Sequence, residues 1–187
     1  MTQPEAEART RASTLADELA AGLRNMGRLV AMLTYARRTT LKAVEGLTVA
    51  QLDHLHDPMS NSIGALLAHA AALEVACQCA TFERRGLSDA ERARWGAALE
   101  LGARARREIR GHDLDHYRSL LDEVRARTLR ELGERDDAWL EETTPGRGGR
   151  AVSNYFRWFH VLEDEISHRG QMRWLRQRLP NDARSST

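Results

Sequence analysis

The sequence is poor in the residues that build cross-linked, fibrous or disordered proteins. Its 187 residues include two cysteines, four prolines and 13 glycines, and 42% of them are hydrophobic. Cys77 and Cys79 are too few and too close together for a disulfide framework, and the hydrophobic content is too high for a disordered chain. We therefore expect one domain over residues 1–187, with a core from about 13 to 180 and polar ends.

The chain also lacks an excess of charge of either sign. Its 28 basic and 27 acidic residues leave a formal net charge of +1, which argues against a nucleic-acid partner or an anionic membrane surface. Lys42 is the only lysine, and this preference for arginine, with much alanine, is typical of a GC-rich bacterial genome. No basic segment followed by an apolar one stands at the N-terminus, so we expect a cytoplasmic protein.

One stretch needs to be compared with a membrane span. Residues 63–80 are long enough for a short span, but His69, Glu74 and Gln78 interrupt them. Polar side chains at such intervals favour a helix buried inside a soluble protein, and we expect no membrane partner.

Several catalytic motifs are missing as well. There is no G-x-S-x-G nucleophile motif, and the glycine-rich segment 146–149 lacks the preceding strand and the following GK[ST] of a phosphate-binding loop. Strand signals are weak, because no run of residues alternates between apolar and polar for more than a few positions. These absences exclude the common nucleotide-binding folds and serine hydrolases.

The sequence does have strong helical periodicity. Apolar residues recur every three or four positions in four stretches, which run from about 13 to 44, from 61 or 62 to about 85, from 113 to 132, and from 153 or 154 to 179. Shorter helical segments follow Thr48 and Ser88, and residues 96–112 read as a connector. Four long helices in one domain of this size predict an all-α four-helix bundle with short extra helices in the connections.

Polar residues embedded in these helices are the candidates for a site. His69 lies among alanines and leucines, where it is either a core histidine with a backbone or carboxylate partner or a ligand. In the last helix, His160, Asp164 and His168 are spaced four residues apart and share one strip of the helix surface. Asp164 and His168 can reach one ion, and His69 would complete a three-ligand site with open positions, as in catalytic metal centres.

The alternative for Asp164 and His168 is a solvated pair on a charged helix. Against this alternative, aromatic residues point in several directions around the last helix, which predicts that the helix is covered on most sides. They are Tyr155, Trp158, Phe159 and Trp174. Other candidates are weaker: the pairs His54/His56 and His112/His116 are expected to be solvated, and Cys77 and Cys79 to be small core residues on nearly opposite helix faces.

Three segments resemble the DinB-like superfamily, in particular its DUF664 branch. They are MLTYARRTTLKAVEGLTVAQLD, NSIGALLAHAAALE and FHVLEDEISHRGQMRWLR, and the similarity extends from about residue 28 to 180. The resemblance implies a four-helix bundle of up-down-down-up topology, often dimeric, with a divalent metal site of three residues. Relatives are similar to thiol-dependent S-transferases and to mycothiol-dependent maleylpyruvate isomerase.

Carried over by position, the resemblance assigns His69, Asp164 and His168 as the metal ligands, with Asp164 standing where many relatives have histidine. His160 and Glu165 then become candidates for orienting a ligand histidine. The metal is expected to be zinc or nickel, with iron also compatible with two histidines and one carboxylate.

The expected function is that of a metal-dependent transferase. The metal would activate a low-molecular-weight thiol for attack on a small electrophile, and mycothiol is favoured because the composition suggests an actinobacterial host. Two alternatives stay open: a non-enzymatic, stress-associated bundle that dimerises and keeps a vestigial metal site, and a hydrolase in which the same metal activates water.

Overall fold

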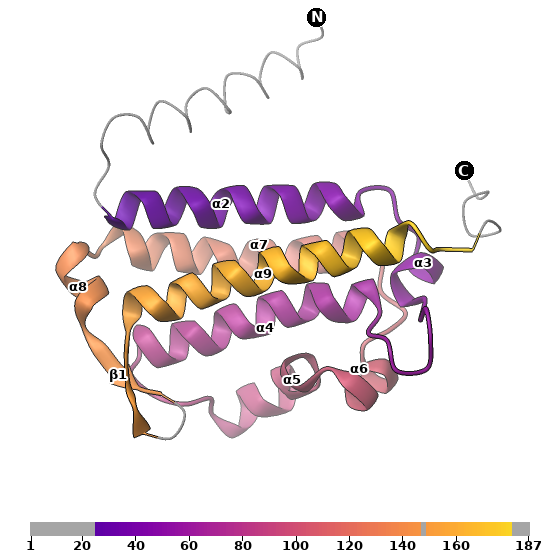
Figure 1. Ribbon diagram of the computed structural model, residues 1–187. Coiled ribbons are helices and arrows are strands. Elements are labelled where there is room, and N and C mark those ends of the chain that lie inside the picture. Colours follow the sequence, from indigo (N-terminus) through magenta and orange to yellow (C-terminus); the bar gives the residue numbers. More distant parts are fainter. Residues whose placement is uncertain (1–24, 147–148, 181–187) are drawn as a thin grey trace, which may run out of the picture.

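The computed structural model describes residues 25–146 and 149–180. In this part of the chain four long helices form the bundle that the sequence predicts. They are α2 (Asn25–Val44), α4 (Ile63–Thr81), α7 (Leu114–Gly133) and α9 (Asn154–Arg176). Helices α2 and α9 run in one direction and α4 and α7 in the other, which is the up-down-down-up topology (Figure 1). The predicted helical residues 13–24 and the polar ends lie outside the described residues.

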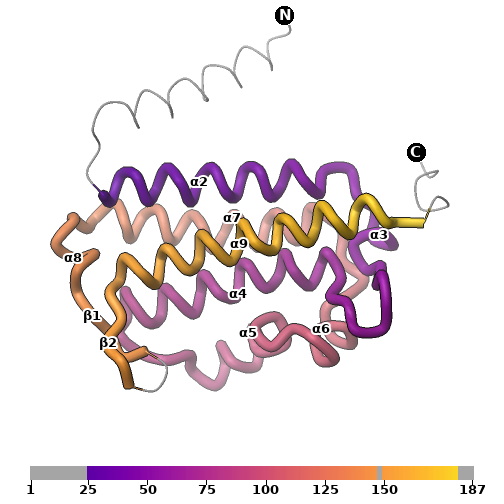
Figure 2. The backbone as a smooth tube through the Cα atoms, in the orientation of Figure 1, coloured from indigo at the N-terminus to yellow at the C-terminus, as the bar shows by residue number. Residues whose placement is uncertain are grey.

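The long helices surround a common core. Helix α2 packs against α9 and α7, and α4 packs against the same two helices, so the tube in Figure 2 shows each long helix beside two others. Short helices occupy the connections: α3 (Val49–Asp53), α5 (Asp89–Glu100), α6 (Gly102–Glu108) and α8 (Asp137–Glu141). The prediction of an all-α bundle with short extra helices is confirmed.

Side-chain caps fix where the helices begin. The hydroxyls of Ser62 and Ser153 and the carboxylate of Asp113 each accept a hydrogen bond from the backbone N–H three residues later, at the start of α4, α9 and α7. Ser88 and Glu91 form the reciprocal capping box at the start of α5. The sequence predicted these starts, because the capping residue and the apolar period are both local signals.

Helix ends and connections differ more from the predictions. Helix α4 ends at Thr81 rather than near residue 85, and the connector at 96–112 contains helical residues of α5 and α6, separated by Leu101 at φ 56°. Two short antiparallel strands, β1 (Thr143–Pro145) and β2 (Ala151–Ser153), pair in a region where no strand was predicted. Strands of three residues are too short to show an alternating pattern.

Helix α4 is the most buried of the four long helices. Among the described residues it is the one helix long and apolar enough to cross a membrane, and 78% of its apolar window is buried inside the protein. Its two cysteines are both buried and belong to different apolar clusters, Cys77 to one and Cys79 to the other. This placement agrees with the prediction of core residues on opposite helix faces.

A buried charge cluster joins the four long helices. We call it the tetrad: Arg37 from α2, Glu74 from α4, Arg125 from α7 and Glu165 from α9, each at most 5% exposed. Each guanidinium bonds both carboxylates at nitrogen–oxygen distances between 2.7 and 3.2 Å. Two positive and two negative charges compensate one another here, which is what buried ions require.

Candidate metal centre

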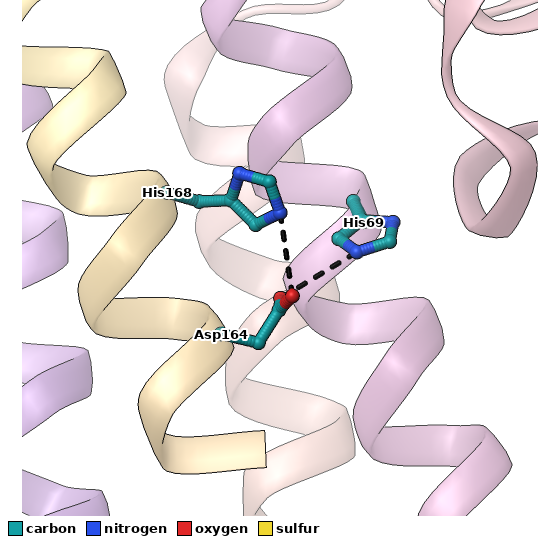
Figure 3. Close-up of side chains that lie close together, drawn as sticks. All are labelled: His69, Asp164 and His168. Atoms are coloured by element: carbon teal, nitrogen blue, oxygen red, sulfur yellow. Dashed lines mark ion pairs between the residues drawn. The ribbon is translucent and has the colours of Figure 1, made fainter. Parts of the chain in front are cut away.

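The three predicted ligands lie together, although they come from two separate helices. His69 of α4 faces Asp164 and His168 of α9 (Figure 3). The His69 Nε2 atom is 3.5 Å from Asp164 Oδ2, and His168 Nε2 is 3.4 Å from Asp164 Oδ1. One ligand atom from each residue lies within 4.8 Å of the others. The one-turn spacing of Asp164 and His168 and the packing of α4 on α9 together produce this arrangement.

A backbone carbonyl orients the ring of His69. The His69 Nδ1 atom is 2.8 Å from the carbonyl oxygen of Ala98 in α5. A carbonyl can only accept a hydrogen bond, so Nδ1 must carry the proton and donate it. In the neutral ring, Nε2 is then a bare lone pair that faces the Asp164 carboxylate. Two lone pairs in contact repel, so this arrangement calls for a proton or a cation between them.

Polar atoms of the site have no hydrogen-bond partner. Among the described residues, Asp164 Oδ2 and His168 Nδ1 are buried and make no hydrogen bond. The three side chains are 12%, 17% and 13% exposed for His69, Asp164 and His168, so the cluster is shielded but reachable from one side. Buried polar atoms without partners are rare in native proteins and indicate a missing water, ion or ligand.

The electrostatics of the site favour a carboxylate anion. Burial by itself would raise the pKa of the Asp164 carboxyl, but His168 and His69 outweigh burial and hold this pKa well below its ordinary value. Burial by itself would lower the pKa of His69, but the Asp164 carboxylate and the Ala98 carbonyl raise it. The site therefore attracts positive charge, whether a proton or a metal ion.

A divalent metal fits these distances. Two ligand atoms at about 2.05 Å from a tetrahedral zinc ion are about 3.3 Å apart, close to the 3.4 and 3.5 Å between each histidine and its nearer Asp164 oxygen, and all three ligand atoms lie within 4.8 Å of one another. Two imidazole nitrogens and one carboxylate oxygen are borderline ligands that suit zinc, nickel or iron(II). Three protein ligands would leave further coordination positions for a ligand.

The two residues expected to orient a ligand histidine have other partners. His160 is exposed and its Nδ1 is 3.3 Å from Glu163 Oε2. Glu165 is buried in the tetrad, bound by Arg37 and Arg125. Because Glu165 lies about 100° around the helix from Asp164, it points to the bundle centre instead of the site. The Ala98 carbonyl, which the sequence did not suggest, has the orienting role for His69.

The surroundings of α9 correct one step of the sequence argument. The helix is not covered on most sides: Tyr155, Phe159 and Trp174 are 41%, 45% and 44% exposed, and only Trp158 of the four aromatic residues is buried. Helix α9 packs chiefly on α2 and α4, so its outer face stays open. His112 and His116 are exposed, as expected, and stack on each other with ring centroids 3.9 Å apart.

Comparisons with known proteins agree with this fold. The family model described as mycothiol-S-transferase matches residues 28–180. No curated protein matches the sequence. A crystal structure of a conserved protein from Enterococcus faecalis is similar, with a TM-score of 0.67 and 17% identity over 84% of this chain and 98% of that one. At this identity the similarity shows a shared fold.

Proposed function

This chain belongs to the mycothiol-S-transferase family, and we propose that it joins the sulfur of mycothiol to a small electrophile at a divalent metal held by His69, Asp164 and His168. The observation that carries the proposal is the convergence of three ligand atoms within 4.8 Å of one another, with Asp164 Oδ2 and His168 Nδ1 buried and without a hydrogen bond among the described residues. A solvated surface pair would not be organised in this way.

Each residue has a defined part in this proposal. His69 and His168 would present their Nε2 atoms to the ion and Asp164 its carboxylate, while the Ala98 carbonyl fixes the ring of His69. Zinc or nickel is favoured, and iron is compatible with the same ligands. When bound, the ion supplies positive charge that lowers the pKa of a thiol at an open position.

The nucleophile has to come from the cosubstrate. Burial raises the pKa of the Cys77 thiol far above its ordinary value, and burial together with Glu91 raises the pKa of Cys79 to about 11. Neither cysteine is a thiolate at neutral pH, and neither contacts the metal ligands. In the reaction the thiol sulfur forms a bond to the electrophilic carbon, the leaving group departs with its electron pair, and the thiol proton passes to solvent.

The test is conjugation of mycothiol to monochlorobimane by protein purified without a histidine tag. The wild type is expected to conjugate the thiol, to lose activity on chelation and to regain it with zinc or nickel. His168→Ala should reduce kcat/KM by at least about 100-fold, because removing a ligand opens the site. The matched control is His160→Ala on the same helix, an exposed histidine outside the site, which should stay within about twofold of wild type.

The possible failures are distinct. Conjugation that survives both chelation and His168→Ala would remove the metal from the mechanism. Stoichiometric bound metal without conjugation would favour the non-enzymatic bundle, or a hydrolase if ester or amide substrates are cleaved instead.

A further inference from the structure

A surface groove of about 600 Å³ runs beside the candidate metal centre. One wall is the segment 59–61 that precedes α4, and the other is formed by α9. The α9 residues that line it are Ser167, Gly170, Gln171, Trp174 and Leu175. At Gly170 an added Cβ would meet no atom within 4 Å, so the groove is open at this point.

The groove begins at the outer edge of the metal ligands. Ser167 and Gln171 follow Asp164 by three and seven residues, so they share a side of α9 with Asp164 and His168. From Ser167 to Trp174 the groove follows α9 for about 10 Å, at 1.5 Å per residue. A molecule with one end at the open side of the metal site could therefore extend along the groove without leaving the protein surface.

Hydrogen bonds hold the wall opposite α9. The Asp57 carboxylate accepts from the backbone N–H groups of Met59 and Ser60 at 2.7 and 2.9 Å. Arg106 donates to the Met59 carbonyl at 3.0 Å, and Asn61 Oδ1 accepts from the Gly102 N–H at 2.9 Å. The segment is thus fixed by contacts to α6 and its own turn, which makes the groove a preformed surface.

The residues that line the groove are a mixture of polar and apolar ones without a formal charge. No residue that lines it is acidic or basic, although 29% of the chain is charged. The groove between α5 and α7, by contrast, is lined by charged residues such as Glu91, Arg94 and Glu123. Among the described residues the side chains of Ser167 and Gln171 make no hydrogen bond. The Trp174 ring is 44% exposed, with the Arg178 guanidinium over it and His56 in edge contact. Hydroxyl, amide and indole groups together suit a neutral ligand with many hydroxyls.

We propose that this groove binds the sugar portion of the thiol cosubstrate. The inference rests on the proposed function, since it places the sulfur of the same molecule at the metal site. Mycothiol carries its cysteine on an uncharged pair of six-membered rings rich in hydroxyls, which matches the groove in length and chemistry. Glutathione instead has no sugar rings, so it would leave the hydroxyl and amide groups of the groove without these partners. The groove therefore selects the glycosylated thiol.

The experiment compares mycothiol with N-acetylcysteine, which has the reacting part of the molecule without the sugars. The wild type is expected to prefer mycothiol in kcat/KM. Gln171→Ala and Trp174→Ala should each raise KM for mycothiol about tenfold, because each variant removes one hydrogen bond or ring contact to the sugars. Both variants should leave kcat/KM for N-acetylcysteine and the metal content within about twofold. Arg173→Ala, between them on the outer face of α9, is the control and should resemble wild type for both thiols.

The outcomes separate this inference from the proposed function. If the wild type uses both thiols equally, or if the variants impair both thiols equally, the groove does not bind the sugars, although the transferase proposal survives. If neither thiol is conjugated, calorimetric titration with S-methylated mycothiol decides: binding that both variants weaken supports the groove, and absence of binding to the wild type overturns it.

Discussion

Asp164 and Glu165 are neighbours in the sequence but lie in different surroundings. Glu165 is 2% exposed, and both of its carboxylate oxygens accept hydrogen bonds from arginine, one from Arg37 and the other from Arg37 and Arg125. Among the described residues the Asp164 carboxylate forms ion pairs with the two histidines, and its Oδ2 makes no hydrogen bond. About 100° around α9 therefore separates a carboxylate with both oxygens hydrogen-bonded from one with an oxygen that makes no hydrogen bond.

The basic side chains around Glu165 and Asp164 also differ in whether they can lose a proton. The guanidinium groups of the tetrad stay charged at every accessible pH, and each also donates to a carbonyl of another helix, Arg37 to Leu121 and Arg125 to Leu33. The tetrad thus links all four long helices and has no capacity left for a ligand. The imidazoles around Asp164 can lose a proton and offer lone pairs, so this cluster is completed only from outside. The first arrangement serves the fold and the second suits binding.

The largest expected difference between the two carboxylates is in stability. We predict that Glu165→Gln lowers the free energy of unfolding by about 3–5 kcal/mol, because it leaves two buried guanidinium groups with one carboxylate between them. The same chemical change one residue earlier, Asp164→Asn, should cost less in metal-free protein, since the Asp164 side chain is 17% exposed and its partners are two histidines at 3.4 and 3.5 Å instead of two buried guanidinium groups. Urea denaturation of both variants without metal measures the difference.

Equal losses in the two variants would remove the contrast between the clusters. Glu163→Gln, an exposed change on the same helix, controls for the effect of an amide on helix α9 itself.

The three side chains of the candidate metal centre could be brought together from the sequence, but the tetrad was missed. His69 stands out in an apolar helix, and Asp164 and His168 are one turn apart, so both signals are local. Arg37 and Arg125 resemble the many solvated arginines of this chain. A signal was nevertheless present: Arg37 lies on the same strip of α2 as the buried Leu33, Thr40 and Val44. A charge on a core strip requires a buried partner, and Glu74 in the most apolar helix was the corresponding acid.

Contacts that depend on packing could not be predicted. The Ala98 carbonyl holds His69 only because α5 lies against α4, and the sequence of residues 96–112 gave no clear helical pattern. Likewise, Glu165 was expected beside the metal because it adjoins Asp164 in the sequence. Its actual position depends on which face of α9 meets the bundle centre, and this is set by tertiary contacts rather than by spacing.

The second prediction tests whether the candidate metal centre binds zinc. Zinc at 100 times its dissociation constant should raise the free energy of unfolding of the wild type by about 2.7 kcal/mol, because the ion binds only the folded chain. Asp164→Asn should show little of this gain at the same zinc concentration, since it lacks the anionic ligand. Glu163→Gln should retain it. Denaturation of each of the three proteins with zinc and with chelator gives the six values, and an equal gain in Asp164→Asn would place the ion elsewhere.

The smallest expected effect comes from Thr128, a neutral residue that is hydrogen-bonded to the tetrad. The Thr128 hydroxyl donates to Glu74 Oε1 at 2.6 Å and accepts from the Gln78 amide. Thr128→Val keeps the shape but removes this donor, and we predict a loss of about 1–2 kcal/mol at neutral pH. Thr81→Val is the matched control: Thr81 is a similarly buried threonine of α4, and its hydroxyl donates to the Cys77 carbonyl instead of a member of the tetrad.

Acid unfolding distinguishes these two threonines. Burial by itself would raise the pKa of the Glu74 carboxyl, but Arg125 and Arg37, with help from Thr128, hold it below its ordinary value of 4.5. A carboxyl with a lowered pKa stabilises the fold above its ordinary pKa, and this contribution is lost as the pH falls through the folded value. Thr128→Val raises the folded pKa, so its acid unfolding should begin at a higher pH than that of Thr81→Val. If the two variants are equally destabilised and unfold at the same pH, then the two arginines lower the pKa of Glu74 without help from Thr128.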